Sequence, residues 1–284
     1  DRGSYSYLAT QKYFSRRPGD LLELGCQSFR EVVGKVENNE ADYAVLPVEN
    51  TTSGSINEVY DQLQNTELSI IGELTHAIKH SLLVAKETTL ANIKTLYAHP
   101  QVFTQCSHFL AELGNVEVKT MDATSSAMLK VSELNRDDVA AIGSEAGGNL
   151  YGLFAIKSNL ANQKENHSRF IVVAKQPVVV PLQVPAKTTF VMSTVQKPGA
   201  LVEALMVLKE NNINMTKLES RPIPGNPWEE LFYIDVEGNT QDGPVQSALI
   251  ELKRITRYLK VLGCYPSEEI NPTKVAASKA LTAG

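Results

Sequence analysis

The chain has 284 residues, 43% of them hydrophobic and 21% charged, which is typical of a folded globular protein of one or two domains. Its net charge of −5 argues against a nucleic-acid partner, and no run approaches the roughly 20 apolar residues that would cross a membrane. The three cysteines, Cys26, Cys106 and Cys264, are far apart and form no disulfide or metal-binding pattern. We therefore expect a cytoplasmic protein that binds neither nucleic acid nor membrane.

Short β-rich runs alternate with helical patterns from residue 40 to about residue 175, which predicts an α/β fold with a largely parallel sheet. The expected strands lie at 43–48, 68–71, 82–85, 116–118, 139–142 and 170–174. Between them, apolar residues recur at helical spacing within 56–63, 102–113 and 127–134. Each of these stripes predicts a buried helix face.

A proline-punctuated stretch at 176–186 predicts a stiff extended linker and a domain boundary. Beyond it we expect a strand at 188–195, a helix at 199–211 and a strand at 213–221. The next strand alternates, with Phe232, Ile234 and Val236 inward and Tyr233, Asp235 and Glu237 outward; a helix extending to Leu259 and a strand at 261–265 follow. This βαββαβ order is ferredoxin-like. The tail from Asn271 has no periodicity and is expected to be poorly ordered.

Several turns in the first part of the chain are rich in glycine and small hydroxyl residues. They lie at 3–6, 50–54, 124–126 and 144–148, each beside a predicted helix or strand end. Helix N-termini offer unpaired N–H groups and a partial positive charge, so such turns gathered at strand ends would bind a carboxylate or phosphate. The alternative for each single turn is that its Ser or Thr is an ordinary helix cap.

Two groups of polar residues adjoin predicted buried strands. Glu49 and Asn50 follow an apolar strand and could orient or polarise a substrate there. Ser168 and Arg169 lead into another strand, where Arg169 could hold a carboxylate with two hydrogen bonds and Ser168 could donate one. The alternative for the second group is a strand-entry turn in which the Arg stem covers apolar surface.

Metal and cofactor signatures are missing from the sequence. His76 and His80 are four residues apart, but no third ligand stands at metal-binding spacing. Neither a G-x-S-x-G nucleophile turn nor a fingerprint for nucleotide phosphates occurs. These observations predict cofactor-free chemistry or plain binding, with no metal.

The segment from Tyr43 to Ser55 resembles the most characteristic segment of prephenate dehydratases. Residues 3–6, 99–101 with 105–106, and 168–170 are similar to the other motifs of this family, in the family's order. Ala98 stands where a serine commonly precedes His-Pro-Gln, and Ser168 stands where the family has Thr. The resemblance covers the chain to about residue 270 and is strongest to bifunctional chorismate mutase/prephenate dehydratases, whose mutase segment would precede residue 1.

The resemblance implies conversion of prephenate to phenylpyruvate, water and CO₂ without a cofactor. Ser168 would donate a hydrogen bond to the departing hydroxyl group, while Glu49, Asn50 and Gln105 would support the substrate and this donor. The residues implied to bind the substrate are Ser4, Thr51, Ser53, Thr124, Arg169 and Phe170.

The C-terminal part resembles the ACT domain that is attached to these enzymes. The resemblance implies feedback inhibition by L-phenylalanine, bound at sites shared between subunits of a homodimer or larger homo-oligomer. The residues implied to bind it are Gly199, Ala200, Leu201, Val202, Asn214, Met215, Glu219, Ser220, Arg221 and Pro222.

The resemblance also implies a two-lobed dehydratase domain, like periplasmic binding proteins, over residues 1–175. One lobe would comprise 1–74 and 159–175 and the other 75–158, followed by the linker at 176–186, the ACT domain at 187–270 and the tail at 271–284. Two alternatives stay open. The chain could be a receptor for an amino acid or dicarboxylate without turnover, or a weakened dehydratase kept for sensing phenylalanine, as Ala98 and Ser168 suggest.

Overall fold

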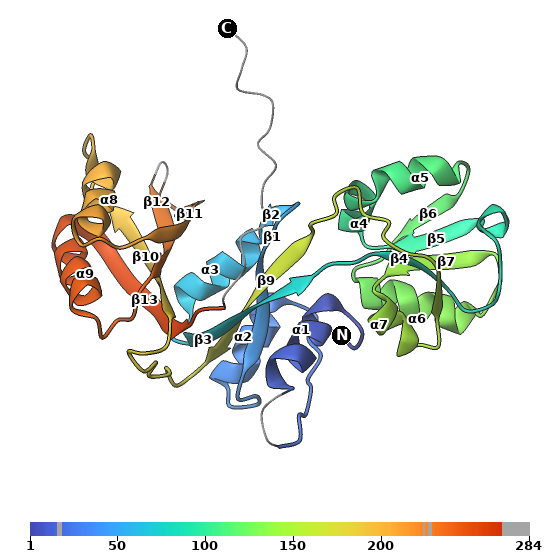
Figure 1. Ribbon diagram of the computed structural model, residues 1–284, viewed down its shortest axis with the longest axis horizontal. Helices are drawn as coiled ribbons and strands as arrows, with labels where there is room; N and C mark the ends of the chain where they lie inside the picture. Colours follow the sequence, from blue (N-terminus) through green and yellow to red (C-terminus); the bar gives the residue numbers. More distant parts are fainter. Residues whose placement is uncertain (16–18, 224, 227–228, 269–284) are drawn as a thin grey trace, which may run out of the picture.

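The computed structural model describes residues 1–15, 19–223, 225–226 and 229–268, and three β-sheets organise this part of the chain. Figure 1 shows the first sheet in the middle of the molecule, the second at one end and the third at the other. The first two sheets and their helices form two lobes, and the third sheet with two helices follows the linker. The predicted fold class, a two-lobed α/β unit followed by a βαββαβ unit, is confirmed.

The first lobe is built on an antiparallel sheet with strand order β2-β1-β9-β3. Its strands are β1 (Ala44–Asn50), β2 (Gly54–Ser55), β3 (Ser69–Ala77) and β9 (His167–Ala174), and its helices are α1 (Tyr5–Phe14), α2 (Phe29–Glu37) and α3 (Asn57–Asn65). Helix α1 packs on the sheet face that carries Phe170 and Val172. Helices α2 and α3 pack on the opposite face, which carries Ile171 and Val173.

The second lobe has strand order β6-β5-β7-β4-β8, in which β5 runs parallel to β6 and β7, while β4 is antiparallel to β7 and β8. The strands are β4 (Ser81–Val84), β5 (Thr95–Ala98), β6 (Glu117–Thr120), β7 (Val139–Gly143) and β8 (Phe154–Lys157). The helices are η1 (Leu90–Asn92), α4 (Pro100–Gln105), α5 (Ser107–Leu113), α6 (Thr124–Leu134) and α7 (Glu145–Asn149). The stripe at 102–113 belongs to two helices, because the backbone leaves helical geometry at Cys106.

The expectation of one largely parallel sheet is wrong. The second lobe is inserted between β3 and β9, so the chain passes between the lobes twice, as Figure 1 shows. Strand β9 returns from the second lobe and lies between β1 and β3, antiparallel to both. Alternation of strands and helices along the sequence does not reveal this return, and the parallel arrangement is confined to β6, β5 and β7.

The third sheet carries the βαββαβ unit, with strand order β11-β12-β10-β13 and antiparallel pairing throughout. Its elements are β10 (Ala186–Thr194), α8 (Ala200–Glu210), β11 (Met215–Pro222), β12 (Glu230–Glu237), α9 (Gly243–Ile255) and β13 (Thr256–Pro266). Both helices cover one face of the sheet, around Phe190, Ile234 and Val236. Helix α9 ends at Ile255, so Leu259 lies in β13 and not in the helix.

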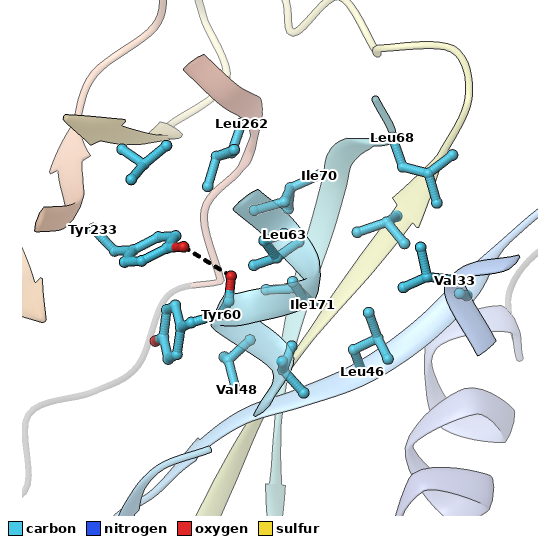
Figure 2. Close-up of a cluster of buried hydrophobic side chains, with 14 of the residues drawn as sticks. Val33, Leu46, Val48, Tyr60, Leu63, Leu68, Ile70, Ile171, Tyr233 and Leu262 are labelled. Atoms are coloured by element: carbon cyan, nitrogen blue, oxygen red, sulfur yellow. Dashed lines mark hydrogen bonds between the residues drawn. The ribbon is translucent and has the colours of Figure 1, made fainter. Parts of the chain in front are cut away.

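The other face of the third sheet packs against the first lobe. Tyr233 and Asp235 lie on this face, opposite Ile234 and Val236, as the alternation predicts, but both side chains are buried between the two bodies instead of exposed to solvent. Figure 2 shows Tyr233 and Leu262 beside Ile70, Leu63 and the helix that carries Tyr60, and the Tyr233 hydroxyl donates to the Tyr60 carbonyl at 2.8 Å. A Cβ at Gly263 would lie 2.2 Å from the Ile70 carbonyl oxygen, so glycine is needed where β13 meets β3.

The segment from Lys175 to Pro185 contains neither helix nor strand, in keeping with its three prolines. The tail from Asn271, expected to be poorly ordered, lies outside the described residues. No helix in the described part of the chain is long and apolar enough to cross a membrane.

Candidate active site

Strands β1 and β9 bring Asn50 and Ser168 together where the first lobe meets the second. The two residues are direct partners in the sheet, and both are buried. The Asn50 Nδ2 amide lies within donor distance of Ser168 Oγ (3.0 Å), the Asn166 side-chain oxygen (2.7 Å) and the His167 carbonyl (3.1 Å). This predicted pair is therefore a close contact between an amide donor and a hydroxyl group.

The turn after β1 fixes the orientation of the Asn50 amide. Asn50 Oδ1 accepts from the backbone N–H groups of Thr52 (2.9 Å) and Ser53 (3.0 Å) and from the hydroxyl groups of both residues (2.6 and 3.0 Å). Backbone N–H groups can only donate, so the atom they meet is the amide oxygen, and the amide nitrogen points to Ser168. Ser168 Oγ accepts from Asn50 and, among the described residues, donates its own hydrogen to none.

Gln105 joins this group from the second lobe. Its Nε2 donates to the Thr52 hydroxyl at 3.1 Å, and its Oε1 accepts from Asn166 Nδ2 at 3.3 Å. The same oxygen lies 2.7 Å from Nε2 of His80, a buried residue between β3 and β4. Gln105 thus contacts the first lobe through Thr52 and Asn166, and each of these two residues is hydrogen-bonded to Asn50, the partner of Ser168.

Helix N-termini of the second lobe gather at one edge of its sheet. Because β5, β6 and β7 are parallel, the helices that follow them begin along the same edge, at His99, Thr124 and Ser144. The Ser125 hydroxyl at the start of α6 is buried and is the one buried side-chain polar atom of the described residues without a hydrogen-bond partner. Such an edge can bind a carboxylate, with Thr124 half-buried at its rim.

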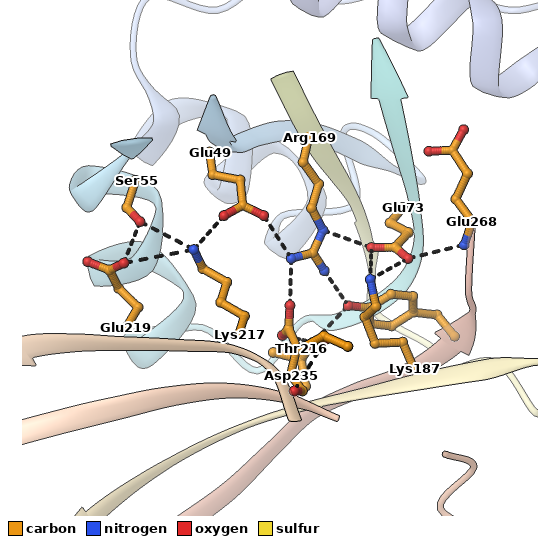
Figure 3. Close-up of polar contacts among 12 residues, drawn as sticks. Glu49, Ser55, Glu73, Arg169, Lys187, Thr216, Lys217, Glu219, Asp235 and Glu268 are labelled. Atoms are coloured by element: carbon orange, nitrogen blue, oxygen red, sulfur yellow. Dashed lines mark hydrogen bonds and ion pairs between the residues drawn. The ribbon is translucent and has the colours of Figure 1, made fainter. Parts of the chain in front are cut away.

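Arg169 and Glu49 face away from this group, toward the third sheet. Figure 3 shows the Arg169 guanidinium surrounded by carboxylates. It donates to Glu73 Oε2 (2.8 Å), Glu49 Oε1 (3.2 Å), Asp235 Oδ2 (2.5 Å) and the Tyr265 hydroxyl (2.9 Å). The structure does not bring Arg169 to Ser168, because neighbouring residues of a strand point to opposite faces. Four of the five guanidinium N–H groups already donate to protein groups.

Two lysines complete this charged layer between the bodies. Lys217 Nζ lies 2.5 Å from Glu49 Oε2, and Lys187 Nζ lies 2.8 Å from Glu73 Oε1. Burial by itself would raise the pKa of Glu49, but the hydrogen bond and charge of Lys217, together with Arg169, lower it below its ordinary value. Glu49 is therefore an anion that holds the two bodies together, and it does not contact the group around Asn50.

The other residues predicted to bind substrate are spread over different environments. Phe170 is buried in the core beneath α1. Thr51 is exposed and ties the turn to β9, since its N–H donates to the His167 carbonyl and its hydroxyl accepts from the His167 N–H. Ser4 caps α1 by accepting from the Tyr7 N–H, next to the second lobe, where Gly3 packs on α7.

The residues predicted to bind phenylalanine form two groups. Those from Gly199 to Val202 line a pocket of about 480 Å³ in the loop before α8, with Gly199 in the left-handed region (φ +81°). Asn214 and Met215 line a second pocket of about 500 Å³ at the other end of α8. In contrast, Arg221 pairs with Asp61 of the first lobe, Glu219 accepts from Ser55, and Ser220 and Pro222 are exposed.

The site also contains groups that we did not single out from the sequence as functional: Tyr5, Thr52, His80 and Asn166. His80 drew attention only as a metal ligand, and no cluster that could hold a metal ion occurs among the described residues. The sequence does point to Thr52 and Tyr5, because both lie in segments that resemble family motifs, 43–55 and 3–6. No local pattern points to His80 or Asn166, because their hydrogen-bond partners Gln105 and Asn50 lie far away in the sequence.

The chain is similar to known proteins over nearly its whole length. The family model described as prephenate dehydratase matches residues 1–178. A bifunctional chorismate mutase/prephenate dehydratase of Enterobacter agglomerans is 55% identical over 273 residues, which cover 96% of this chain and 70% of that protein. The crystal structure of an Arthrobacter aurescens prephenate dehydratase in complex with L-Phe superposes with a TM-score of 0.84 at 26% identity, covering 97% of this chain and 91% of that one.

A second solved structure has the same fold and a different description. It is titled as GqqA, a novel type of quorum quenching acylase, and it is 30% identical with a TM-score of 0.84, covering 94% of this chain and 96% of that one. Two described activities on one fold mean that the fold by itself does not assign the chemistry. The assignment must rest on the family match and on the groups that the site presents.

Proposed function

The chain belongs to the prephenate dehydratase family, and from this premise we propose that it converts prephenate to phenylpyruvate, water and CO₂. The observation that carries the proposal is the Ser168 hydroxyl. Its oxygen accepts from the oriented Asn50 amide, so its hydrogen remains free to donate to the substrate.

The reaction needs a donor at one oxygen atom. The bond between the ring carbon and the hydroxyl oxygen breaks with its electron pair on oxygen, and the departing hydroxide takes one proton from solvent to become water. The bond between the ring and its carboxylate breaks, which releases CO₂ and leaves the electron pair of that bond in the aromatic ring. Aromatisation supplies the driving force, so the site has to hold the geometry and assist departure of the hydroxyl group. Ser168 would donate a hydrogen bond to that oxygen as negative charge develops on it.

The two carboxylates of prephenate call for hydrogen-bond donors without competing anions. The start of α6, with Thr124 and the unpartnered Ser125 hydroxyl, supports binding of one carboxylate in the second lobe. The Thr51–Ser53 turn, Ser4 and Gln105 would contact the rest of the substrate. Glu49, Arg169 and Phe170 have no direct place in this scheme, because they contact the third sheet or the core.

Regulation by L-phenylalanine is the second part of the proposal. The pockets beside Gly199–Val202 and at Asn214–Met215 present backbone groups that can hold the amino and carboxylate groups of an amino acid. We propose that a second copy of the chain completes these sites in a homodimer or larger homo-oligomer, so that the effector favours one arrangement of subunits. Lys217 and Arg221, on the same strand as Met215, contact the first lobe and connect it to this unit.

The domain organisation follows the same logic. We propose a dehydratase domain over residues 1–175, a linker at 176–186 and an ACT domain from residue 187 to about 270. The break of secondary structure between β9 and β10 supports the first boundary. A cytoplasmic location is part of the proposal, supported by the separated free cysteines Cys26, Cys106 and Cys264.

The test is turnover of prephenate by the purified chain near neutral pH, followed by formation of phenylpyruvate with and without L-phenylalanine. We expect rapid formation that phenylalanine suppresses. Ser168→Ala should lower kcat by about 100- to 1,000-fold, the usual loss when one oriented hydrogen-bond donor is removed from a site, with prephenate binding retained. Ser15→Ala, at an exposed position beyond α1, is the matched control.

The outcomes separate the candidate functions. An unchanged rate in Ser168→Ala would remove the proposed role of Ser168. A folded chain that binds phenylalanine but leaves prephenate at its uncatalysed rate would be a sensing protein, the alternative that Ala98 and Ser168 suggested.

A further inference from the structure

The donor and the acceptor of each hydrogen bond around Asn50 can be assigned, starting from the Asn50 amide and continuing to Asn166 and Gln105. Because the Asn50 oxygen is identified by two backbone N–H groups, its nitrogen must donate, and its partner on Asn166 must be the side-chain oxygen. The Asn166 nitrogen then faces Gln105 at 3.3 Å, so the Gln105 atom there is its oxygen. Gln105 Nε2 consequently donates to Thr52, whose hydroxyl donates to Asn50.

This chain of donors and acceptors continues to His80. The Gln105 oxygen can only accept, and His80 Nε2 lies 2.7 Å from it, so this ring nitrogen carries a hydrogen. Burial lowers the pKa of His80 despite the hydrogen bond with Gln105, which favours the neutral ring near pH 7. A neutral ring protonated at Nε2 has an unprotonated Nδ1, which must accept a hydrogen bond if it is to be satisfied.

Tyr5 of helix α1 contacts this nitrogen. Its hydroxyl lies 3.0 Å from His80 Nδ1 and 2.8 Å from the Lys79 carbonyl, and since a carbonyl can only accept, the single hydroxyl hydrogen is shared between these two acceptors. The two rings meet edge to face, with centroids 5.6 Å apart. His80 is 2% exposed, so its ring is held on both nitrogens and by packing, at the point where the chain passes from β3 to β4.

We propose that His80, held by Tyr5, is a positioning residue of the dehydratase site, which acts as the Nε2-protonated ring on Gln105 and through it on Asn50 and Ser168. The inference rests on the proposed function. It gives a role in orienting the site to a histidine that contacts neither Asn50 nor Ser168 directly. It also explains how one buried ring orients groups of both lobes, since Gln105 belongs to the second lobe and Thr52 and Asn166 lie at the edge of the first.

Turnover of prephenate by single variants is the first part of the test. His80→Leu, which keeps the volume and removes both nitrogens, should lower kcat and kcat/KM together by about 10- to 100-fold, because Gln105 and the groups beyond it lose their fixed geometry. His80→Gln retains an amide that can donate to Gln105 and should stay within about fivefold of the unchanged chain. His108→Gln, on the exposed surface of α5, is the control.

A double-mutant cycle distinguishes positioning from a general loss of stability. In a Gln105→Ala background, His80→Leu should change kcat by less than about twofold, because the residue through which it acts is gone. A further loss by the full single-variant factor would overturn the proposal. Tyr5→Phe tests the outer contact by removal of one hydroxyl, with a loss of a few-fold in kcat that disappears in the His80→Leu background. If His80→Leu does not fold, His80→Phe, which also removes both ring nitrogens, takes its place in both cycles.

A readout independent of activity keeps this inference separate from the proposed function. The ¹⁵N chemical shifts of the His80 ring in the unchanged chain should identify hydrogen on Nε2 and none on Nδ1. Hydrogen on Nδ1 alone would overturn the assignment whatever the activity. A chain with the Nε2-protonated ring but no turnover of prephenate would instead contradict the proposed function.

Discussion

The two faces of the strand pair β1 and β9 differ in kind. On the face toward α1, Asn50 and Ser168 belong to a network of neutral amides, hydroxyl groups and one buried histidine. On the opposite face, their chain neighbours Glu49 and Arg169 belong to a layer of carboxylates, lysines and one guanidinium that holds the third sheet. One peptide bond separates the two environments in each strand.

The difference shows how the same strands can serve chemistry and attachment. On the neutral face, the hydroxyl hydrogen of Ser168 has no acceptor among the described residues, so it can donate to a substrate. The charged face leaves little to complete, because Arg169 already meets three carboxylates and a tyrosine hydroxyl. A site for a dianionic substrate is expected where donors are free and anions are absent, which favours the neutral face.

The largest effect is expected from loss of the charge of Arg169. Arg169→Met would leave Glu73 and Asp235 buried, at 3% and 5% side-chain exposure, without their shared cation. Removal of one partner from such a buried group should lower the free energy of unfolding by about 3–5 kcal/mol, measured by urea unfolding at pH 7.

Arg221→Met is the matched control for this prediction. Arg221 also makes two hydrogen bonds to one carboxylate, but Asp61 is 45% exposed, so the expected loss is about 1 kcal/mol or less. Equal losses in the two variants would show that the charged layer is no more important for stability than a surface ion pair.

On the neutral face, the sharpest change is Asn50→Asp, which keeps the shape and replaces the amide donor by an acceptor. The carboxylate oxygen would then face the oxygen atoms of Ser168, Asn166 and His167. We expect kcat for prephenate to fall by about 100-fold, the usual loss when one oriented donor is removed from a site. Asn65→Asp, exposed at the end of α3, introduces the same charge and should leave kcat unchanged.

Much of the fold can be predicted from the sequence, and the limits have a physical cause. The hydrophobic period identifies individual strands and helices, and the βαββαβ order of the last part follows directly from it. The partners of β9 and the cover over Tyr233 and Asp235 depend on contacts between distant segments. No local pattern encodes those contacts, so the expected parallel sheet is wrong, and the alternation in β12 gives the correct face for Tyr233 and Asp235 but not their burial.

The separation of the two faces was only partly predictable from the sequence. Alternation along β9 by itself places Ser168 and Arg169 on opposite faces. For Glu49 and Asn50 the register shifts between Pro47 and Glu49, and this irregularity puts Glu49 opposite Arg169 and Asn50 opposite Ser168. No residue pattern in the sequence signals a bulge of this kind, so the sequence places Glu49 and Asn50 in one functional group.

A smaller effect is expected from Glu49→Gln, and its pH dependence has a definite sign. Because Lys217 and Arg169 lower the pKa of Glu49 below 4.5, its carboxylate stabilises the folded chain above pH 4.5, and this contribution is lost as the pH falls through the folded value. The variant should be less stable than the unchanged chain by about 1 kcal/mol at pH 7, since the side chain is 32% exposed. Urea unfolding at pH 7, 5.5, 4.5 and 3.5 should find that this difference shrinks below pH 4.5.

Glu112→Gln, at 66% exposure, is the control and should give a difference near zero at each pH. A difference for Glu49→Gln that grew as the pH fell would contradict the assignment of Glu49 as an anion held by the third sheet.

The smallest effect is expected from Ser168→Thr, which asks how tightly the neutral face defines its free hydroxyl. The change keeps the oxygen that accepts from Asn50 and adds a methyl group that restricts side-chain rotation, in a strand where β-branched residues fit well. We expect kcat for prephenate within about threefold of the unchanged chain, because the donor and its partner are both retained. A loss beyond tenfold would mean that the direction of the hydroxyl hydrogen is set by the space around Ser168 and not by the Asn50 amide. The corresponding conservative change on the charged face, Arg169→Lys, cannot reproduce four hydrogen bonds from one planar group and should lower the free energy of unfolding. Ser168→Thr should leave the free energy of unfolding unchanged, so the two variants together would separate the face used for chemistry from the face used for attachment.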